Sequence, residues 1–127
     1  DLLRMGKSRA LLSRINQLNQ AYVVYCEGGE KDKKRLVHLL SKLYIQVKET
    51  RKLGSAALEL AWVGTGRSDC YITTQISLWD IAAGILFVRE GGGEVLHFDG
   101  SPYQWLEFEA QKKFDLLATN GKILLSL

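Results

Sequence analysis

Strand-like runs alternate with segments of helical periodicity along the sequence, and this alternation restricts the chain to a small set of folds. Five short runs are predicted as strands: AYVVYC (21–26), ETRKL (49–53), DCYITT (69–74), EVLHF (94–98) and FDLLAT (114–119). Helices are predicted between or after them, from residue 32 onward and over 54–66, 78–90 and 121–127. This alternation is typical of an α/β fold, in which helices cover a layered sheet. Residues 9–20 fit either a helix or a strand end with a turn, and both remain open.

The helix that starts near residue 32 is predicted from the spacing of its apolar residues. These residues recur every three or four positions: Leu36, Leu40, Leu43 and Val47. Asp32 is the predicted N-cap, because its carboxylate can accept hydrogen bonds from the free amides of the first turn. The basic cluster KDKKR (31–35) is then explained as a solvated helix start.

Length and charge bound the domain count and the partners. The chain has 127 residues, which suffices for one domain with a core and is too short for two. No repeat, linker or low-complexity segment divides it, so we expect a single domain over residues 1–127. The net charge of +3 is mild, and no dense basic stripe is interleaved with aromatic residues. We therefore expect no nucleic-acid partner.

Cysteines, histidines and apolar runs exclude several other classes. Cys26 and Cys70 form no CxxC pattern, and His38 and His97 give no zinc-ligand spacing. We therefore expect free thiols in a reducing compartment. No apolar run approaches the ~20 residues that span a bilayer, and no signal peptide is visible. These observations predict a cytoplasmic protein without a membrane partner.

The stretch LWDIAAGILFVREGGG (78–93) places one carboxylate, Asp80, at the start of an otherwise apolar helix. One interpretation is a cap, because an Asp at this position accepts hydrogen bonds from unpaired amides and complements the helix dipole. The other is a metal ligand, because a carboxylate fixed on a rigid helix suits a hard cation such as Mg²⁺. In either case we expect a helix that is buried on most faces. Trp79 is expected as a core anchor, and Trp62 and Trp105 are also expected in the core.

A second stretch, RKLGSAALEL (51–60), leads from a strand into Gly54, Ser55 and Ala56 at a helix start. Small residues let a ligand approach the backbone, and free amides together with the Ser55 hydroxyl can hold anionic or hydroxyl groups. A tight strand-to-helix turn capped by Ser55 explains the same residues, and both interpretations remain open.

Taken together, these two stretches resemble the inositol monophosphatase family of Mg²⁺-dependent, lithium-sensitive phosphatases. The resemblance runs in order and with the family's spacing from about residue 21 to the end of the chain. The matching pieces are Arg51-x-x-Gly54-Ser55-Ala56-Ala57, Gly66-Arg67-x-Asp69, Trp79-Asp80-x-Ala82-Ala83-Gly84, Gly92-Gly93 and Asp99-Gly100. It implies the C-terminal half of the αβαβα sugar-phosphatase fold.

The resemblance also implies roles for individual residues. It makes Asp80 a ligand of Mg²⁺, which is the expected cofactor. It places the turn at 54–56 against substrate hydroxyls and gives Arg51 an ion-pairing or orienting role. Thr73 is implied as a substrate-binding residue, at the position where inositol-specific members carry a glutamate that binds substrate hydroxyls. A hydroxyl there can donate or accept, but it is not an anionic acceptor.

The family's other metal ligands lie in an N-terminal lobe, on a glutamate and on an Asp-Pro-x-Asp-Gly-Thr segment. That segment is absent from this sequence, and the residues that activate the water are absent with it. We therefore expect the chain to be the C-terminal lobe of a phosphatase, cut off before Asp1, without a catalytic residue of its own and inactive alone. The resemblance further implies a small phosphorylated substrate and a homodimer at full length.

Three functions remain compatible with these observations. The first is metal-dependent hydrolysis of a small sugar, polyol or nucleotide phosphate. The second is a fructose-1,6-bisphosphatase or nucleotide 3′-phosphatase of the same superfamily, which a panel of phosphate esters would separate from the first. The third is a non-catalytic binding or assembly module. Loss of the N-terminal ligands fits this third function, whereas retention of Asp80 disfavours it, because Asn or Ser would cap the helix equally well.

Overall fold

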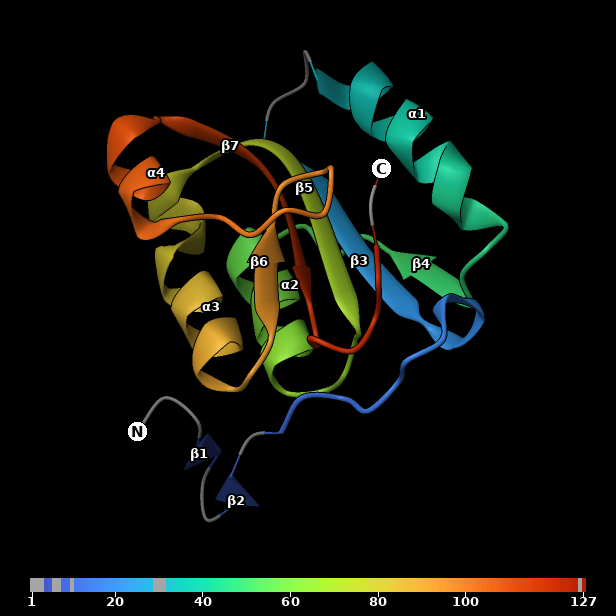
Figure 1. Ribbon diagram of the computed structural model, residues 1–127. Coiled ribbons are helices and arrows are strands. Elements are labelled where there is room, and N and C mark those ends of the chain that lie inside the picture. The colour runs from blue at the N-terminus through green and yellow to red at the C-terminus, as the bar shows by residue number, and fades with distance from the viewer. Residues whose placement is uncertain (1–3, 6–7, 10, 29–31, 126) are drawn as a thin grey trace.

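A five-stranded mixed sheet forms the centre of the protein (Figure 1). The computed structural model describes residues 4–5, 8–9, 11–28, 32–125 and 127. The strands follow the order β4-β3-β5-β7-β6 across the sheet. Their bounds are Tyr22–Glu27 for β3, Glu49–Arg51 for β4, Cys70–Ser77 for β5, Glu94–Leu96 for β6 and Lys113–Thr119 for β7. All five predicted strands are present, and the predicted α/β class is confirmed.

The direction of the strands brings several loops to one edge of the sheet. Strand β3 runs parallel to both β4 and β5, whereas β7 runs antiparallel to β5 and β6. Val23 pairs with Thr50 on one side and with Cys70 on the other. The carboxyl ends of β3, β4 and β5 therefore lie together, at the edge where ligands bind in open parallel sheets.

The two faces of the sheet bury different sets of side chains, because successive residues of a strand point to opposite faces. One face packs against helix α1 (Lys33–Tyr44) and the C-terminal segment. The other packs against helices α2 (Ala56–Gly64) and α3 (Leu78–Glu90). The alternation is visible along β3 and β5, where Val23 and Cys70 face α1 while Val24 and Tyr71 face the α2–α3 layer. The cysteines Cys26 and Cys70 are both free, as predicted.

Helices α2 and α3 lie side by side on their face of the sheet (Figure 1). The contact is close because a glycine lies on each helix at the crossing. A Cβ atom at position 84 would lie 2.6 Å from Cβ of Leu60, and one at position 64 would lie 2.3 Å from the ring of Phe87. The two helices therefore form one tightly packed layer that fixes the starts of both.

Helix α1 starts where the sequence predicts, but the predicted N-cap residue does not cap it. Asp32 occupies the N-cap position without accepting a hydrogen bond from the first-turn amides. Its carboxylate instead pairs with Arg35 at 3.0 Å, and Arg35 also reaches Asp115 on β7 at 2.6 Å. The helix ends at Tyr44, so Val47 lies beyond it.

The C-terminal segment is not the helix that the sequence predicts. Residues 121–125 carry no helix. The Oδ1 atom of Asn120 accepts hydrogen bonds from the amides of Lys122 at 2.9 Å and Ile123 at 3.2 Å, which closes a turn instead. Ile123 and Leu125 are buried while Leu124 is exposed. This period of two is the pattern of an extended segment.

A short helix that the sequence analysis did not predict, α4 (Trp105–Ala110), connects β6 and β7. It starts with a capping box in which the side chains and backbone of Gln104 and Glu107 bond reciprocally. Residues 11–17, left open above, form neither a helix nor a strand, and a 3₁₀ turn (η1, Leu18–Gln20) follows them. Residues 4–5 and 8–9 form a small antiparallel pair, β1 and β2.

The tryptophans and the α3 surface correct two predictions. Trp79 is 81% exposed and Trp105 is 55% exposed, so neither is a core anchor, whereas Trp62 does pack against the core. Helix α3 buries a single stripe formed by Ile81, Ile85 and Val88. Leu78 and Phe87 are half-buried, and three further small or apolar side chains of the helix are exposed: Ala82, Ala83 and Leu86. No helix within the described residues is both long and apolar enough to cross a membrane.

Candidate active site

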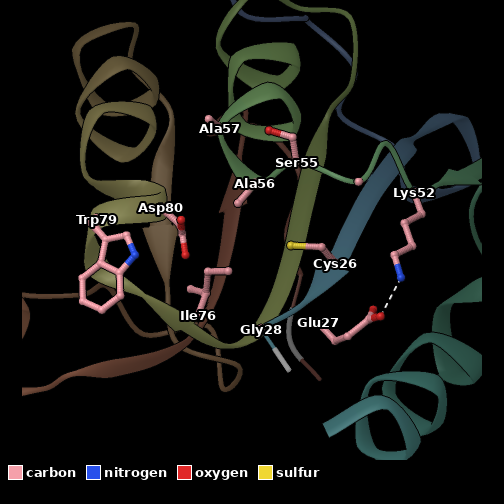
Figure 2. Close-up of a pocket in the computed structure, with 11 residues that line it drawn as sticks. Cys26, Glu27, Gly28, Lys52, Ser55, Ala56, Ala57, Ile76, Trp79 and Asp80 are labelled. Atoms are coloured by element: carbon pink, nitrogen blue, oxygen red, sulfur yellow. Dashed lines mark hydrogen bonds and ion pairs between the residues drawn. The ribbon is translucent and has the colours of Figure 1, made fainter. Parts of the chain in front are cut away.

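A cleft of about 520 Å³ opens at the carboxyl edge of the parallel strands (Figure 2). Three segments of the chain line it, each at or just beyond the carboxyl end of a strand. The first holds Cys26, Glu27 and Gly28, the second Lys52 and residues 54–57, and the third Ile76, Trp79 and Asp80. The fold thus brings together the two stretches that the sequence analysis singled out.

Asp80 is the third residue of α3, and Ser77 occupies the N-cap position. Within the described residues no amide of the helix donates to the Asp80 carboxylate, so the predicted cap is wrong. The side chain is exposed and points into the cleft (Figure 2). It still complements the positive end of the helix dipole. Its lone pairs are therefore available to a ligand.

The start of α2 forms a second wall of the cleft. Ser55 is the N-cap, and its hydroxyl oxygen accepts a hydrogen bond from the amide of Leu58 at 3.3 Å, which confirms the predicted cap. Gly54 has a φ of 83°, a conformation that a residue with a Cβ rarely adopts. Ala56 and Ala57 follow with small side chains. The first amides of the helix are thus approachable by an anion or a hydroxyl group.

An ion pair between Glu27 and Lys52 forms the wall opposite Asp80 (Figure 2). The distance from Nζ of Lys52 to Oε1 of Glu27 is 2.6 Å. This hydrogen bond lowers the pKa of Glu27 and raises the pKa of Lys52. The pair therefore remains charged at neutral pH.

Behind the cleft lies a buried polar cluster around Cys26. The thiol Sγ lies 2.9 Å from the Tyr71 hydroxyl and 3.5 Å from the Thr73 hydroxyl. Burial raises the pKa of Cys26, so the thiol is neutral and is not a nucleophile. Glu59 is also buried there, and burial raises the pKa of its carboxyl.

The floor of the cleft depends on a glycine at position 28. The amide of Gly28 donates to the carbonyl oxygen of Thr74 at 2.7 Å, and a Cβ atom here would lie 1.9 Å from the carbonyl oxygen of Gln75. Only glycine fits so close an approach. Gln75 itself lies in the β-bulge of β5 with a φ of 48°, and its amide donates to Asp115.

Of the six site residues predicted from the sequence, four line the cleft and two do not. Gly54, Ser55, Ala56 and Asp80 line it. Thr73 is fully buried on β5, where its hydroxyl contacts Cys26, while Arg51 is exposed on the edge strand β4. Neither of these two lines the cleft, and their substrate-binding roles stay predictions.

Glu27 and Lys52 line the cleft but were not predicted from the sequence. Glu27 directly follows the predicted strand 21–26 and Lys52 lies near the end of the predicted strand 49–53, and these positions were the one available signal. Nothing in the sequence showed that β3 and β4 are neighbours.

The donor atoms suit one position of a Mg²⁺ site. Asp80 supplies an exposed carboxylate that accepts no hydrogen bond from the described residues, and carboxylate oxygens are the kind of ligand that Mg²⁺ prefers. No group of three or more His, Cys, Asp or Glu side chains that could hold a metal ion occurs in the described part of the chain. The residues present thus fit Mg²⁺ as a partial ligand set.

The chain is similar to one protein family and to several individual proteins of known sequence or structure. The model of the inositol monophosphatase family matches residues 5–124. An inositol-1-monophosphatase from Bacillus subtilis is 46% identical over 69 residues, which are 54% of this chain and 26% of that protein. A protein named Nus factor SuhB from Xylella fastidiosa is 42% identical over 81 residues, or 64% of this chain and 30% of that protein.

The inositol monophosphatase from Anabaena superposes with a TM-score of 0.77 at 30% identity, covering 92% of this chain and 45% of the solved one. The chain matches the C-terminal half of that fold. It therefore spans less than half the length of each of these relatives.

Proposed function

Because the chain belongs to the inositol monophosphatase family, we propose that it forms the C-terminal part of a Mg²⁺-dependent phosphomonoesterase for a small sugar, polyol or nucleotide phosphate. The observation that supports this most is the convergence of Asp80 and the start of α2 on one cleft. A carboxylate and a helix N-terminus are complementary to a metal ion and to a phosphate ester, respectively.

In this proposal each wall of the cleft has a separate task. Asp80 holds one coordination position of Mg²⁺. A Mg²⁺ ion held there would supply positive charge against the phosphate oxygens and would lower the pKa of a bound water. The amides near Ser55 and Ala56 donate to oxygen atoms of the substrate, and the small side chains allow close approach. The remaining metal ligands and the group that activates the water come from an N-terminal lobe.

The coding region upstream of Asp1 gives the first test. Codons for a glutamate followed by Asp-Pro-x-Asp-Gly-Thr, in frame with this chain, would support the proposal. A start codon and promoter immediately upstream would contradict it and favour the binding or assembly module instead. We expect the purified 127-residue chain to release no phosphate from any ester in the presence of Mg²⁺. Clear release would contradict the inference that the chain holds only some of the metal ligands.

Replacing the metal-ligand candidate tests the mechanism in the longer enzyme. We expect Asp80→Asn to lower kcat/KM by more than the roughly tenfold to hundredfold loss that outer-shell substitutions cause at metal sites. The fold should persist, because Asp80 accepts no hydrogen bond from its helix. Phosphate release at saturating Mg²⁺, with circular dichroism for the fold, measures both effects.

The matched control is Glu90→Gln, which removes an exposed carboxylate from the opposite end of the same helix. Activity of the control should remain at the level of the parent enzyme. If Asp80→Asn retained activity within a few-fold of the control, the metal-ligand role would be wrong.

A further inference from the structure

We infer that Asp115 is a positioning residue for the cleft, because its carboxylate holds a strained bulge of β5 that determines where α3 and its Asp80 begin. The inference rests on the proposed function in so far as it concerns Asp80 as a ligand of Mg²⁺. Asp115 itself lies outside the cleft and contacts Arg35 of α1, on the face of the sheet that α1 covers. No motif in the sequence marks it.

The bulge lies near the carboxyl end of β5, where this strand pairs with β7. Residues 73–76 of β5 lie opposite residues 114–116 of β7, so β5 contains one extra residue. Within this stretch Gln75 has a φ of 48°, and it is the one non-glycine residue with a positive φ in the described part of the chain. A side chain makes this conformation costly, so it persists only where neighbouring groups hold it.

Asp115 on β7 holds Gln75 in this conformation. Its Oδ1 atom accepts hydrogen bonds from the backbone amide of Gln75 at 2.9 Å and from the Nε2 atom at 3.0 Å. Arg35 donates to the same oxygen at 2.6 Å and fixes the carboxylate. Although burial opposes ionisation, the hydrogen bonds from Arg35 and Gln75 lower the pKa of Asp115 below its ordinary value of 3.8. The carboxylate is therefore charged at neutral pH.

The bulge changes the face of the sheet toward which the end of β5 points. Cys70 and Ile72 pack on the α1 face, and strict alternation would place the side chain of residue 76 there too. Ile76 instead packs in the same cluster as Tyr71, under α2 and α3, and lines the cleft. Because one extra residue reverses the alternation, the bulge turns the end of the strand toward the cleft.

The reversed segment leads directly into α3. Strand β5 ends at Ser77, which is the N-cap of the helix, and Asp80 is the third helical residue. No loop separates strand and helix, so the path of the bulge fixes the position of the Asp80 carboxylate. The bulge also supports the floor of the cleft, because the amide of Gly28 donates to the carbonyl oxygen of Thr74 at 2.7 Å. Gly28, Ile76 and Asp80 all line the cleft (Figure 2).

Hydrogen exchange in the ¹⁵N-labelled chain tests the role of Asp115 without turnover. The probe is the amide of Gly28, because its hydrogen bond to Thr74 depends on the bulge. We expect Asp115→Ala to accelerate its exchange about tenfold or more, the effect of losing hydrogen bonds to a charged group. Asp115→Asn should retain most of the protection, because its amide oxygen still accepts. The control Asp32→Asn removes another carboxylate that pairs with Arg35 and should exchange as the parent does.

A glycine at position 75 separates the relief of strain from a general gain in stability. Glycine adopts a positive φ at no steric cost, so Asp115→Ala combined with Gln75→Gly should restore slow exchange of the Gly28 amide. Gln75→Val, with Asp115 intact, should accelerate the exchange as Asp115→Ala does, because a β-branched residue tolerates a positive φ least. Gln75→Val also provides the test if Asp115→Ala does not fold.

The Mg²⁺ requirement of the longer enzyme tests whether the bulge positions Asp80. We expect Asp115→Ala to raise the Mg²⁺ concentration for half-maximal phosphate release about tenfold or more, as outer-shell substitutions do at metal sites. The double variant with Gln75→Gly should return this concentration to near the parent value. A merely structural role of Asp115 would lower the melting temperature and leave the Mg²⁺ requirement of the folded enzyme unchanged.

The two measurements have distinct outcomes. An unchanged Mg²⁺ requirement of active Asp115→Ala enzyme, or fast Gly28 exchange that Gln75→Gly fails to restore, would overturn the inference and leave the phosphatase intact. Restored exchange in the chain, together with no turnover by the parent enzyme, would overturn the proposed function and the role toward Mg²⁺, and would leave Asp115 as the residue that holds the bulge. Unchanged exchange in Asp115→Ala and no turnover by the parent enzyme would overturn both.

Discussion

Glu59 shows how one side chain sets a pH dependence of stability. It is fully buried at the start of α2, where Oε2 accepts a hydrogen bond from the Leu53 amide at 2.9 Å and Oε1 has no partner among the described residues. Burial raises the pKa of the carboxyl above the ordinary value of 4.5. The folded state therefore favours the protonated form, and the resulting stability is present below pH 4.5 and is lost as pH rises through the raised pKa.

Because the pKa of Glu59 is raised, we predict that Glu59→Gln stabilises the chain at pH 7. The amide keeps the hydrogen bond to Leu53 and carries no charge. The gain comes from removing a buried charge, is expected to be at least about 1 kcal/mol, and should shrink as the pH falls toward 4. Urea unfolding at the two pH values measures it. The exposed control Glu109→Gln should change neither value. Lower stability of Glu59→Gln at pH 7 would contradict the account.

At the scale of elements, the contact between α2 and α3 depends on the absence of a side chain. A Cβ atom at position 84 would lie 2.6 Å from both Cβ and Cδ1 of Leu60. Replacing Gly with Ala in a helix normally gains about 1 kcal/mol, but overpacking costs about 1–3 kcal/mol. We expect Gly84→Ala to destabilise the chain, as measured by urea unfolding.

The double variant Gly84→Ala with Leu60→Ala provides the control for this contact. Removing the Leu60 side chain frees the space, so the two substitutions should cost less together than the sum of their separate effects. A gain in stability from Gly84→Ala alone would show that the helices separate easily.

The elements also show which local patterns are informative. Strand β3 and helix α3 were predicted correctly because each is a continuous apolar run that ends at glycines. The C-terminal run KILLSL has three consecutive apolar residues, which fit a helix and an extended segment alike. The side chain of Asn120 decides between them by closing a turn. Helix α4 was missed although Gln104 and Glu107 have the spacing of a capping box.

Across the whole molecule, the position of the cleft residues follows from strand order, which sequence patterns do not contain. Asp80 and the turn at 54–56 were found because they carry short motifs. Glu27 and Lys52 carry none, and they meet because β3 and β4 are parallel neighbours in the sheet. The expected burial of Trp79 was wrong because an apolar helix was assumed to have neighbours on most sides. In this chain the sheet and α2 cover only part of α3.

The exposed side of α3 has a consequence for the isolated chain. Trp79 is 81% exposed and Leu86 37% exposed, with Ala82 and Ala83 exposed between them. Exposed apolar patches promote association. We therefore expect the sedimentation coefficient of the chain to rise with concentration, and Leu86→Lys to reduce this rise. Leu124→Lys is the control, because Leu124 is exposed outside α3. A monomer at every concentration would contradict this expectation.

The residues that line the cleft are separate from the residues that form the hydrophobic core, and this separation has a consequence for sequence variation. Each wall of the cleft comes from residues at or beyond the end of a different strand, while the two hydrophobic clusters lie between the sheet and its covering layers. Loops tolerate replacement and insertion far better than core elements do. Substitutions or insertions in the segments at the ends of β3 and β4 can therefore change the lining of the cleft one segment at a time while the core stays the same.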